Sequence, residues 1–323
     1  MDTKLLTIRT LVSSLNSPSD QTRLAALRHL RNSSNQDPAS RLHITGAGAV
    51  PRLAAALYSL SHPIQEHAAA TLLNISISDR HALVSSPILL DALSHLLSRH
   101  SSSSSPSAVQ SAAAILHSLL AVVADYRPVV STKHDILRAL VCIISSPDSP
   151  TRSVKDALKA CFGVALHPPS RTAMIRLGMV PALFVLAEKG AGKKTGIFED
   201  ATAVIAQIAG CEESEEAFRK VSGVSVLAGM LGSQNGSVSL RMKENAVSAL
   251  LNLVRFGGER VVEEVREKVG TLDGIVYVQG HGSAKGKSKA VALLKLLLDG
   301  GSSDKIIEDL YPVQSDSGSS CSR

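Results

Sequence analysis

The sequence predicts an all-α protein, an α-solenoid of about seven stacked repeats. The prediction is based on a sequence period of about 44 residues, a second helical pattern that accompanies it, and a composition poor in aromatic residues. Repeats of about 40 to 47 residues with two or three helices each are typical of helical solenoids. A single unit of this kind cannot bury its apolar face alone, so neighbouring units must stack and share one core.

The clearest periodic element is an Ala- and Leu-rich helix. Its reference segment is AAATLLNIS, residues 68–76, in which small residues lead into an apolar, apolar, variable, apolar group. The group recurs in LAALRHL (24–30), SAAAILHSL (111–119), DALKACFGV (156–164), DATAVIAQI (200–208), NAVSALLNL (245–253) and KAVALLKLL (289–297). The variable position, spaced by 45, 43, 46, 44, 45 and 43 residues, holds His29, Asn74, His117, Gly163, Gln207, Asn252 and Lys295. We interpret these seven segments as the third helix of each unit.

A second pattern precedes most of these helices, with apolar residues at offsets 0, 3 and 7 that form one helical face. Its members are Val50/Leu53/Leu57, Leu90/Leu93/Leu97, Ile136/Ala139/Ile143, Val180/Leu183/Ala187 and Val224/Leu227/Leu231. Gly48 and Gly178 each begin a Gly-x-Val-Pro sequence, in which Gly permits a sharp turn and Pro suits the first helical turn. Pro18, Pro63 and Pro106 should start third helices. Each unit is thus expected to be helix, tight turn, helix, short loop, helix.

The period divides residues 1–300 into units at approximately 1–45, 46–85, 86–132, 133–176, 177–221, 222–270 and 271–300. The two terminal units are atypical, as capping repeats are. The first starts directly with a second-type helix (Leu5 to Leu15), and the last has the irregular GTLDGIVYVQGHG where the pattern expects a clean helix. We expect the serine-rich tail, 301–323, to be disordered, and the run HSSSSSPSA (100–108) to be solvated and mobile.

Composition limits the classes of function. Aromatic residues are 3% of the chain and Trp is absent, so the side chains of base-stacking and sugar sites are scarce. Four cysteines without CxxC or histidine pairing indicate neither a zinc site nor a disulfide framework. No apolar run reaches membrane-spanning length. We expect a monomer without cofactor, cytoplasmic or also nuclear, that has no membrane span and does not bind nucleic acid. The net charge of +6 leaves acidic partners open.

The units resemble armadillo repeats over about residues 5–298. The segments that carry the resemblance are GAGAVPRLAAAL (46–57) with HPIQEHAAATLLNIS (62–76), RLGMVPALFVLAE (176–188) and KENAVSALLNLVRFGG (243–258). HPPSRTAMIRLGMVPAL (167–183) and GSAKGKSKAVALLKLL (282–297) are most similar to the repeat region of plant U-box ubiquitin ligases. The resemblance implies a right-handed superhelix whose third helices line a groove. In those ligases a U-box precedes the repeats, whereas here the first repeat starts within about ten residues of Met1, so we expect no ligase activity from this chain alone.

Polar positions on the third helices are the candidates for partner contact. Side-chain amides at one-repeat spacing can donate and accept along the backbone of an extended peptide. The candidates are Asn74, Asn252, Gln207, His29 and His117 at the variable position, His67 and Asn245 seven residues earlier, and Lys159 four residues before Gly163. The alternative interpretation is that the Asn side chains only bond neighbouring backbone. The expected partner is an extended peptide or helical segment of another protein, held in the groove.

The segments that resemble enzymatic motifs lack the residue spacing that those motifs require. GIVYVQGHGSAKGKS (274–288) has the strand, Gly-rich loop and helix of a phosphate-binding loop, yet His281 stands where a Walker loop needs Gly. We therefore interpret it as the loop that enters the last third helix. No HExxH or GxSxG occurs. The predicted function is a non-catalytic scaffold or adaptor linked to ubiquitin-ligase pathways; the alternatives are a ubiquitin-ligase component and a nucleotide-exchange cofactor of a heat-shock chaperone.

Overall fold

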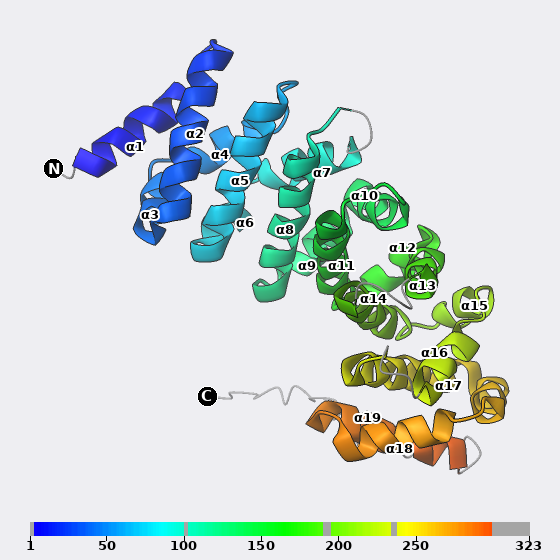
Figure 1. Ribbon diagram of the computed structural model, residues 1–323. Helices are drawn as coiled ribbons and strands as arrows, with labels where there is room; N and C mark the ends of the chain where they lie inside the picture. Colours follow the sequence, from blue (N-terminus) through cyan, green and yellow to red (C-terminus); the bar gives the residue numbers. More distant parts are fainter. Residues whose placement is uncertain (1–2, 100–102, 190–194, 234–237, 299–323) are drawn as a thin grey trace, which may run out of the picture. The chain divides into compact units, whose positions relative to one another are not determined.

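The computed structural model describes residues 3–99, 103–189, 195–233 and 238–298, and the regular structure in these ranges is entirely α-helical (Figure 1). Contacts divide the chain into two compact units, Met1–Glu213 (unit 1) and Ser214–Arg323 (unit 2). Unit 1 holds α1 (Thr3–Ser14), α2 (Asp20–Gln36), α3 (Pro38–Gly46), α4 (Ala49–Ala56), α5 (His62–Ser78), α6 (Arg80–Val84), α7 (Leu89–Ser98), α8 (Pro106–Val122), α9 (Tyr126–Ser131), α10 (His134–Ser145), α11 (Thr151–Ala165), α12 (Pro169–Arg176), α13 (Met179–Lys189) and α14 (Thr195–Ile208). Unit 2 holds α15 (Ser214–Arg219), α16 (Gly223–Gly232), α17 (Leu240–Glu267), α18 (Thr271–His281) and α19 (Ala284–Leu298).

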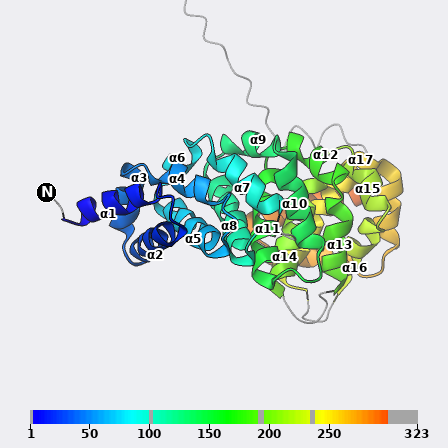
Figure 2. The ribbon, with the colours of Figure 1, turned by 90° about the horizontal axis from the view of Figure 1, so that it is seen from above.

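The seven predicted third helices are α2, α5, α8, α11, α14, the first part of α17, and α19. In unit 1, consecutive members from α2 to α14 pack side by side, and α17 packs on α19 in unit 2. The second helices α4, α7, α10 and α13 form another row, while the short first helices α3, α6 and α9 follow one edge of unit 1 (Figure 2). The predicted architecture, a solenoid of three-helix repeats, is confirmed.

The predicted apolar sets form the core of the second helices. Every member is buried except Ala187, which is half-buried. Pro63 and Pro106 lie in the first turns of α5 and α8, as expected. Pro18 does not start its helix: α2 begins at Asp20, with Ser19 as the N-cap, because the Ser19 hydroxyl accepts a hydrogen bond from the backbone of Thr22.

One expectation about irregular segments is wrong, and another holds only in part. The segment 270–282 is not irregular, because α18 is a continuous helix that Gly270 enters with a φ of 78°. Its Gly274 lies against the Leu231 carbonyl of α16, so the glycine serves close packing. The serine run is solvated only in part where the structure describes it: Pro106 and Ser107 are exposed, whereas Ser104 and Ser105 are buried, and the Ser104 hydroxyl donates to the Leu96 carbonyl over 2.8 Å. Residues 100–102 and the tail 301–323 lie outside the described residues.

Unit 2 departs from the repeat pattern in one respect. α17 runs through both a third helix and the following first helix, across a kink at Gly258, whose φ of 59° and ψ of −148° suit only glycine. The division of residues 1–300 into the seven stated units stays a prediction. No single helix of the described residues is long and apolar enough to cross a membrane; one pair, Pro169–Arg176 with Met179–Ala187, has the length and composition together but is bent by 75°.

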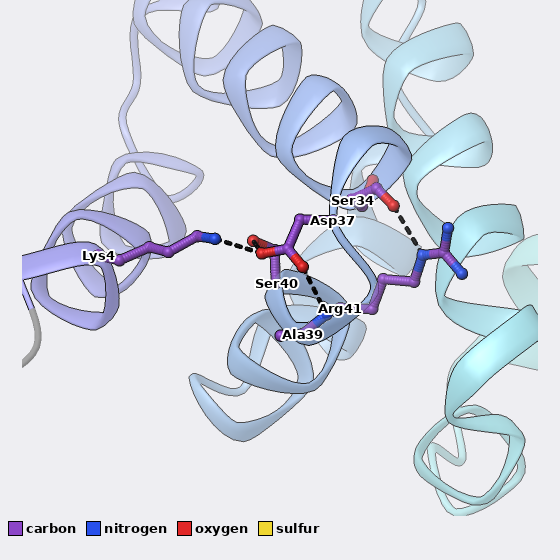
Figure 3. A network of polar contacts seen from close by, with 6 residues as sticks. All are labelled: Lys4, Ser34, Asp37, Ala39, Ser40 and Arg41. Carbon is purple, nitrogen blue, oxygen red and sulfur yellow. Dashed lines mark hydrogen bonds and ion pairs between the residues drawn. The ribbon is translucent and has the colours of Figure 1, made fainter.

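Two kinds of polar interaction recur at the junctions between repeats. Asp37 caps α3 by accepting from the Ala39 backbone and the Ser40 hydroxyl, each over 2.9 Å, and pairs with Lys4 of α1 (Figure 3). Its hydrogen bonds, first of all the one from Lys4, lower the pKa of Asp37 to about 2. Asp79 caps α6 in the next unit in the same way, accepting from the Ala82 backbone over 3.1 Å.

The second kind is made by a set of arginines, here called the arginine clasps. They bind carbonyl oxygens near the C-termini of third helices. Arg41 donates to the Ser34 carbonyl over 2.7 Å and to the Ser78 hydroxyl over 3.0 Å, so it joins the ends of α2 and α5 (Figure 3 shows the first bond). The other clasps are Arg80 to Ser118, Arg127 to Leu120, Arg171 to Ala165 and Gly210, and, in unit 2, Arg266 to Leu297. A cation at a helix C-terminus is favourable because the last carbonyls are unpaired and carry partial negative charge.

We expect Arg171→Ala to lower the free energy of unfolding by about 2 kcal/mol or more, because it removes hydrogen bonds from a charged donor to two backbone carbonyls. Urea denaturation measures the change. Arg176→Ala is the matched control, since Arg176 is exposed on the same helix. A loss equal to that of the control would show that the clasp adds nothing to stability.

Gly163 is the variable position that carries no side chain, and packing explains it. A Cβ added there would lie 2.6 Å from the Leu120 Cβ of α8. We expect Gly163→Ala to destabilise unit 1 by about 1–3 kcal/mol, the usual cost of overpacking. Gly46→Ala is the control because a Cβ at Gly46 meets nothing within 4 Å. Equal midpoints of urea unfolding for the two variants would contradict this explanation.

Candidate functional site

A polar cavity of about 290 Å³ lies across four consecutive third helices of unit 1. We call it the unit 1 cavity. Its lining comes from α2, α5, α8 and α11, and comprises Arg31, Asn35, Glu66, Ala70, Leu73, Asn74, Ser107, Gln110, Ser111 and Arg152. Eight of these ten side chains are polar, so the cavity offers guanidinium, amide, hydroxyl and carboxylate groups to whatever enters it. Such a surface suits recognition by hydrogen bonds.

The acidic group of the cavity is held by the loop before α8. The Ser105 hydroxyl donates to Glu66 Oε1 over 2.5 Å, and the Ser105 backbone N–H donates to Gln65 Oε1 over 2.9 Å. Because Ser105 is fully buried, these bonds fix the first turn of α8 on α5. The cavity wall is thus partly organised before any partner binds.

Asn74, the strongest candidate from the sequence, lines this cavity on α5. Its Nδ2 donates to the Ser34 hydroxyl of α2 over 3.0 Å. The alternative interpretation expected a bond to backbone; the bond that forms is to a side chain of the neighbouring third helix. Asn74 is half-buried, and its amide has more hydrogen-bonding capacity than this one bond uses.

His67 lies one helix away from Arg31, with its Nδ1 3.2 Å from the Arg31 guanidinium. Arginine only donates, so Nδ1 accepts and the proton of the neutral ring is on Nε2. Burial, and then the charges of Arg31 and Arg28, lower the pKa of His67 below its ordinary 6.5. His67 is therefore neutral at neutral pH.

Farther along the row, His117 and Lys159 lie on neighbouring helices, α8 and α11. Burial and then the charge of Lys159 lower the pKa of His117, against opposing charges from Asp156 and Asp200. Asp156 Oδ2 also accepts from Gln110 Nε2 over 3.0 Å, which links α8 to α11. Polar side chains at one register therefore bond each other between units.

Of the eight predicted residues, Asn74 lines the cavity, His67 contacts Arg31 of the lining, and the remaining six lie outside the lining. His29 is exposed on α2, and Gln207 is half-buried on α14. Asn245 and Asn252 belong to unit 2, where both are half-buried on α17. The structure thus brings Asn74, His67 and their neighbours together in unit 1, while partner contact by each of the eight candidates stays a prediction.

The charged walls of the cavity are Arg31, Glu66 and Arg152, and none of them was predicted from the repeat pattern. The predicted residues stand mainly at two offsets, the variable position and the position seven residues earlier. Arg31 is two residues after His29, and Glu66 directly precedes His67, so both stand next to the rows that were followed. A search for charged side chains flanking these rows would have found them.

The segment that resembled a phosphate-binding loop has another use. The Glu244 carboxylate occupies the first turn of α19: it accepts from the Ser283 backbone and from the Ser283 hydroxyl, the latter over 3.0 Å. A Cβ at Gly286 would collide with the same Glu244 side chain, at 2.8 Å. A phosphate there would meet a carboxylate, so the glycines serve packing between α17 and α19.

Other reactive groups give no chemical centre. Within the described ranges, no three His, Cys, Asp or Glu side chains come together as metal ligands. Cys161 is buried, and burial raises the pKa of its thiol, which makes it a poor nucleophile.

The fold and the polar face of its third helices define an armadillo-repeat protein, and comparison with known proteins narrows the class. A sequence model of the plant U-box protein ARM repeat region matches residues 7–312. The chain therefore belongs to the armadillo-repeat family of plant U-box proteins.

Individual relatives agree with this assignment. U-box domain-containing protein 18 of Arabidopsis thaliana is 26% identical over 273 residues, which are 84% of this chain and 38% of that protein. U-box domain-containing protein 8 of the same plant is 27% identical over 90% of this chain and 72% of its own length. The chain spans about two fifths of U-box domain-containing proteins 18 and 19.

Solved structures show the same fold. An engineered protein has a TM-score of 0.75 at 22% identity, over 91% of this chain and 68% of its own. A chain from a study of the interaction between cadherin and beta-catenin has a TM-score of 0.74 at 18% identity, over 91% of this chain and 56% of its own.

We expect Arg31→Gln to raise the pKa of His67 toward 6.5, because one of the two charges that disfavour its protonation is removed. NMR titration of the imidazole ring protons of His67 measures this pKa. Since folding lowers this pKa, the contribution of His67 to stability is present above pH 6.5 and declines as the pH falls below it. Arg138→Gln, on the exposed side of α10, is the control. An equal His67 pKa in both variants would contradict the contact.

Proposed function

We propose that the chain is a non-catalytic scaffold that binds an extended segment of a partner protein along the third helices of unit 1. The observation that carries the proposal is the unit 1 cavity, in which donors and acceptors from four successive repeats line one continuous surface. Its polar groups bond side chains of neighbouring helices, as Asn74 does to Ser34 and Gln110 to Asp156, so the stack holds the surface in place.

The spacing of the repeats suits an extended partner. Packed helices lie about 8–10 Å apart, and an extended chain advances about 3.3 Å per residue, so each repeat faces roughly three residues of the segment. One side chain or peptide group per repeat can then reach an amide such as Asn74. The cavity is small for a whole folded domain and large enough for a few side chains.

The relatives supply the setting of the proposal. They are U-box domain-containing proteins, and the family match covers their armadillo-repeat region. We place this chain on the partner-binding side of a ubiquitin-ligase pathway, as a scaffold or adaptor in the cytoplasm or nucleus.

Quantitative affinity capture tests the proposal. The double variant Arg31→Gln/Arg152→Gln removes two charged walls of the cavity without emptying the core, and we expect specific partners to fall roughly tenfold in recovery, as for loss of interface hot spots. Asn74→Ala, the second variant, should reduce recovery of the same partners.

Arg9→Gln/Arg138→Gln is the matched control, since it makes the same charge change at exposed positions of second helices. Circular dichroism melts establish that all variants remain folded. Recovery that is unchanged in the cavity variants, or reduced equally in the control, would remove the unit 1 cavity from the function.

A further inference from the structure

Unit 2 contains a half-buried arginine with one enclosed nitrogen that makes no hydrogen bond. Arg255 lies on α17, three residues after Asn252 and thus on the third-helix row. Its Nη2 is enclosed by protein and makes no hydrogen bond. Arginine keeps its charge at any ordinary pH, so an enclosed guanidinium nitrogen without an acceptor is unfavourable and demands an explanation.

Two lysines of α19 stand beside it. Lys285 and Lys289 are four residues apart on one side of α19, and α19 packs on α17. The half-buried Lys289 donates to the Ser248 hydroxyl of α17. Burial, followed by the charges of Lys285 and Arg255, lowers the pKa of Lys289. The three side chains therefore form one cluster of like charge, here called the cation cluster.

Within the described ranges, no ion pair supplies the cluster with an anion. The acidic side chains of unit 2 that form ion pairs there serve other cations: Glu215 pairs with Arg260, Glu216 with Lys220, and Glu259 with Arg266. Glu244 is engaged at the start of α19. None of the ion pairs found in the described ranges includes Arg255, Lys285 or Lys289.

Like charges brought together under partial burial destabilise a fold unless something neutralises them. A hydrophobic residue at 255 would pack without this cost. An anion from outside would turn the cost into binding free energy, because it would find a guanidinium and two ammonium groups already gathered and partly desolvated. The cluster lies on the row of third helices, so an extended partner segment bound along that row would supply the anion.

We propose that Arg255, Lys285 and Lys289 form the seat for an acidic side chain of an extended partner segment lying on α17 and α19. This inference rests on the proposed function, and it adds the chemical class of the partner. The anionic group is a carboxylate or a phosphate on that segment. Arg255 would hold it with a planar pair of N–H donors, while the two lysines act as point charges.

Fluorescence anisotropy of the full 323-residue chain tests the seat. The probe is a labelled decapeptide of alternating Glu and Ala; a second peptide carries phosphoserine at two of the Glu positions, and a third has Gln at all of them. We expect the Glu peptide to bind with an affinity that falls as salt rises, and the Gln peptide to bind at least about tenfold more weakly, the effect of losing a charge-assisted hydrogen bond. Tighter binding of the phosphoserine peptide would assign the seat to phosphate, and tighter binding of the Glu peptide to carboxylate.

Substitutions separate the seat from general charge. Arg255→Met and Lys289→Gln should each weaken binding of the Glu peptide at least about tenfold. Lys287→Gln should change it less than about twofold, since Lys287 is exposed on the other side of the same helix. Equal losses in Lys287→Gln and Lys289→Gln would overturn the proposal, as would equal affinity for the Gln peptide or tighter binding of a single-stranded oligonucleotide.

Thermal unfolding distinguishes a binding role of Arg255 from a structural role. Arg255→Met keeps an apolar stem and removes the unpaired charge, so the melting temperature without peptide should stay the same or rise. A lower melting temperature with unchanged peptide binding would make Arg255 structural and sink the proposal. Peptide binding that appears only in a chain ending at Leu298 would assign the seat to residues 299–323, and would also overturn it.

The two proposals can fail separately. If Arg31→Gln/Arg152→Gln leaves partner capture intact while Arg255→Met abolishes binding of the Glu peptide, the cation cluster stands and the unit 1 cavity falls. If the cavity variants lose their partners and the Glu peptide never binds, the cavity stands and the cluster falls.

Discussion

The structure depends on one constraint: each third helix must be covered on two sides by its neighbours and still leave one side to solvent. α8 packs on both α5 and α11. Its Leu116 and Leu119 are fully buried, while Gln110 and His117 are half-buried on the open side. No single repeat can reach this burial alone, so the polar face of the third helices forms in the same event as folding.

Because burial sets the spacing, the fold was largely predictable from the sequence. The apolar residues that repeat about every 44 positions are those that α2, α5, α8 and their successors bury. The arginine clasps were not predictable, since their distance along the chain varies: Arg41 binds a carbonyl seven residues earlier, whereas Arg80 binds that of Ser118, in the next third helix. The kink at Gly258 was also missed, because a single glycine in a helical pattern does not reveal its φ.

The candidate site was predictable only in part, for a related reason. The repeat register placed Asn74 and His67 on the surface of the third helices, where they are found. It could not show that Arg152 of α11 shares a cavity with Arg31 of α2, because that depends on how closely four helices approach one another. Gly163 gives the same lesson, since the missing side chain that seemed to interrupt the row of amides is required by the Leu120 side chain of α8.

The two units differ in whether the charged side chains on their third helices already have partners. This difference decides what each unit can contribute to the proposed binding. In unit 1, Arg31 contacts His67 and Glu66 accepts from Ser105, so charges already have partners and mainly supply orientation and selectivity. In unit 2, the Arg255 Nη2 makes no hydrogen bond and the Arg255 charge acts on Lys289, so an incoming anion gains an interaction that this nitrogen lacks. Salt should therefore weaken the binding of an acidic segment to unit 2 more than the binding of a polar segment to unit 1.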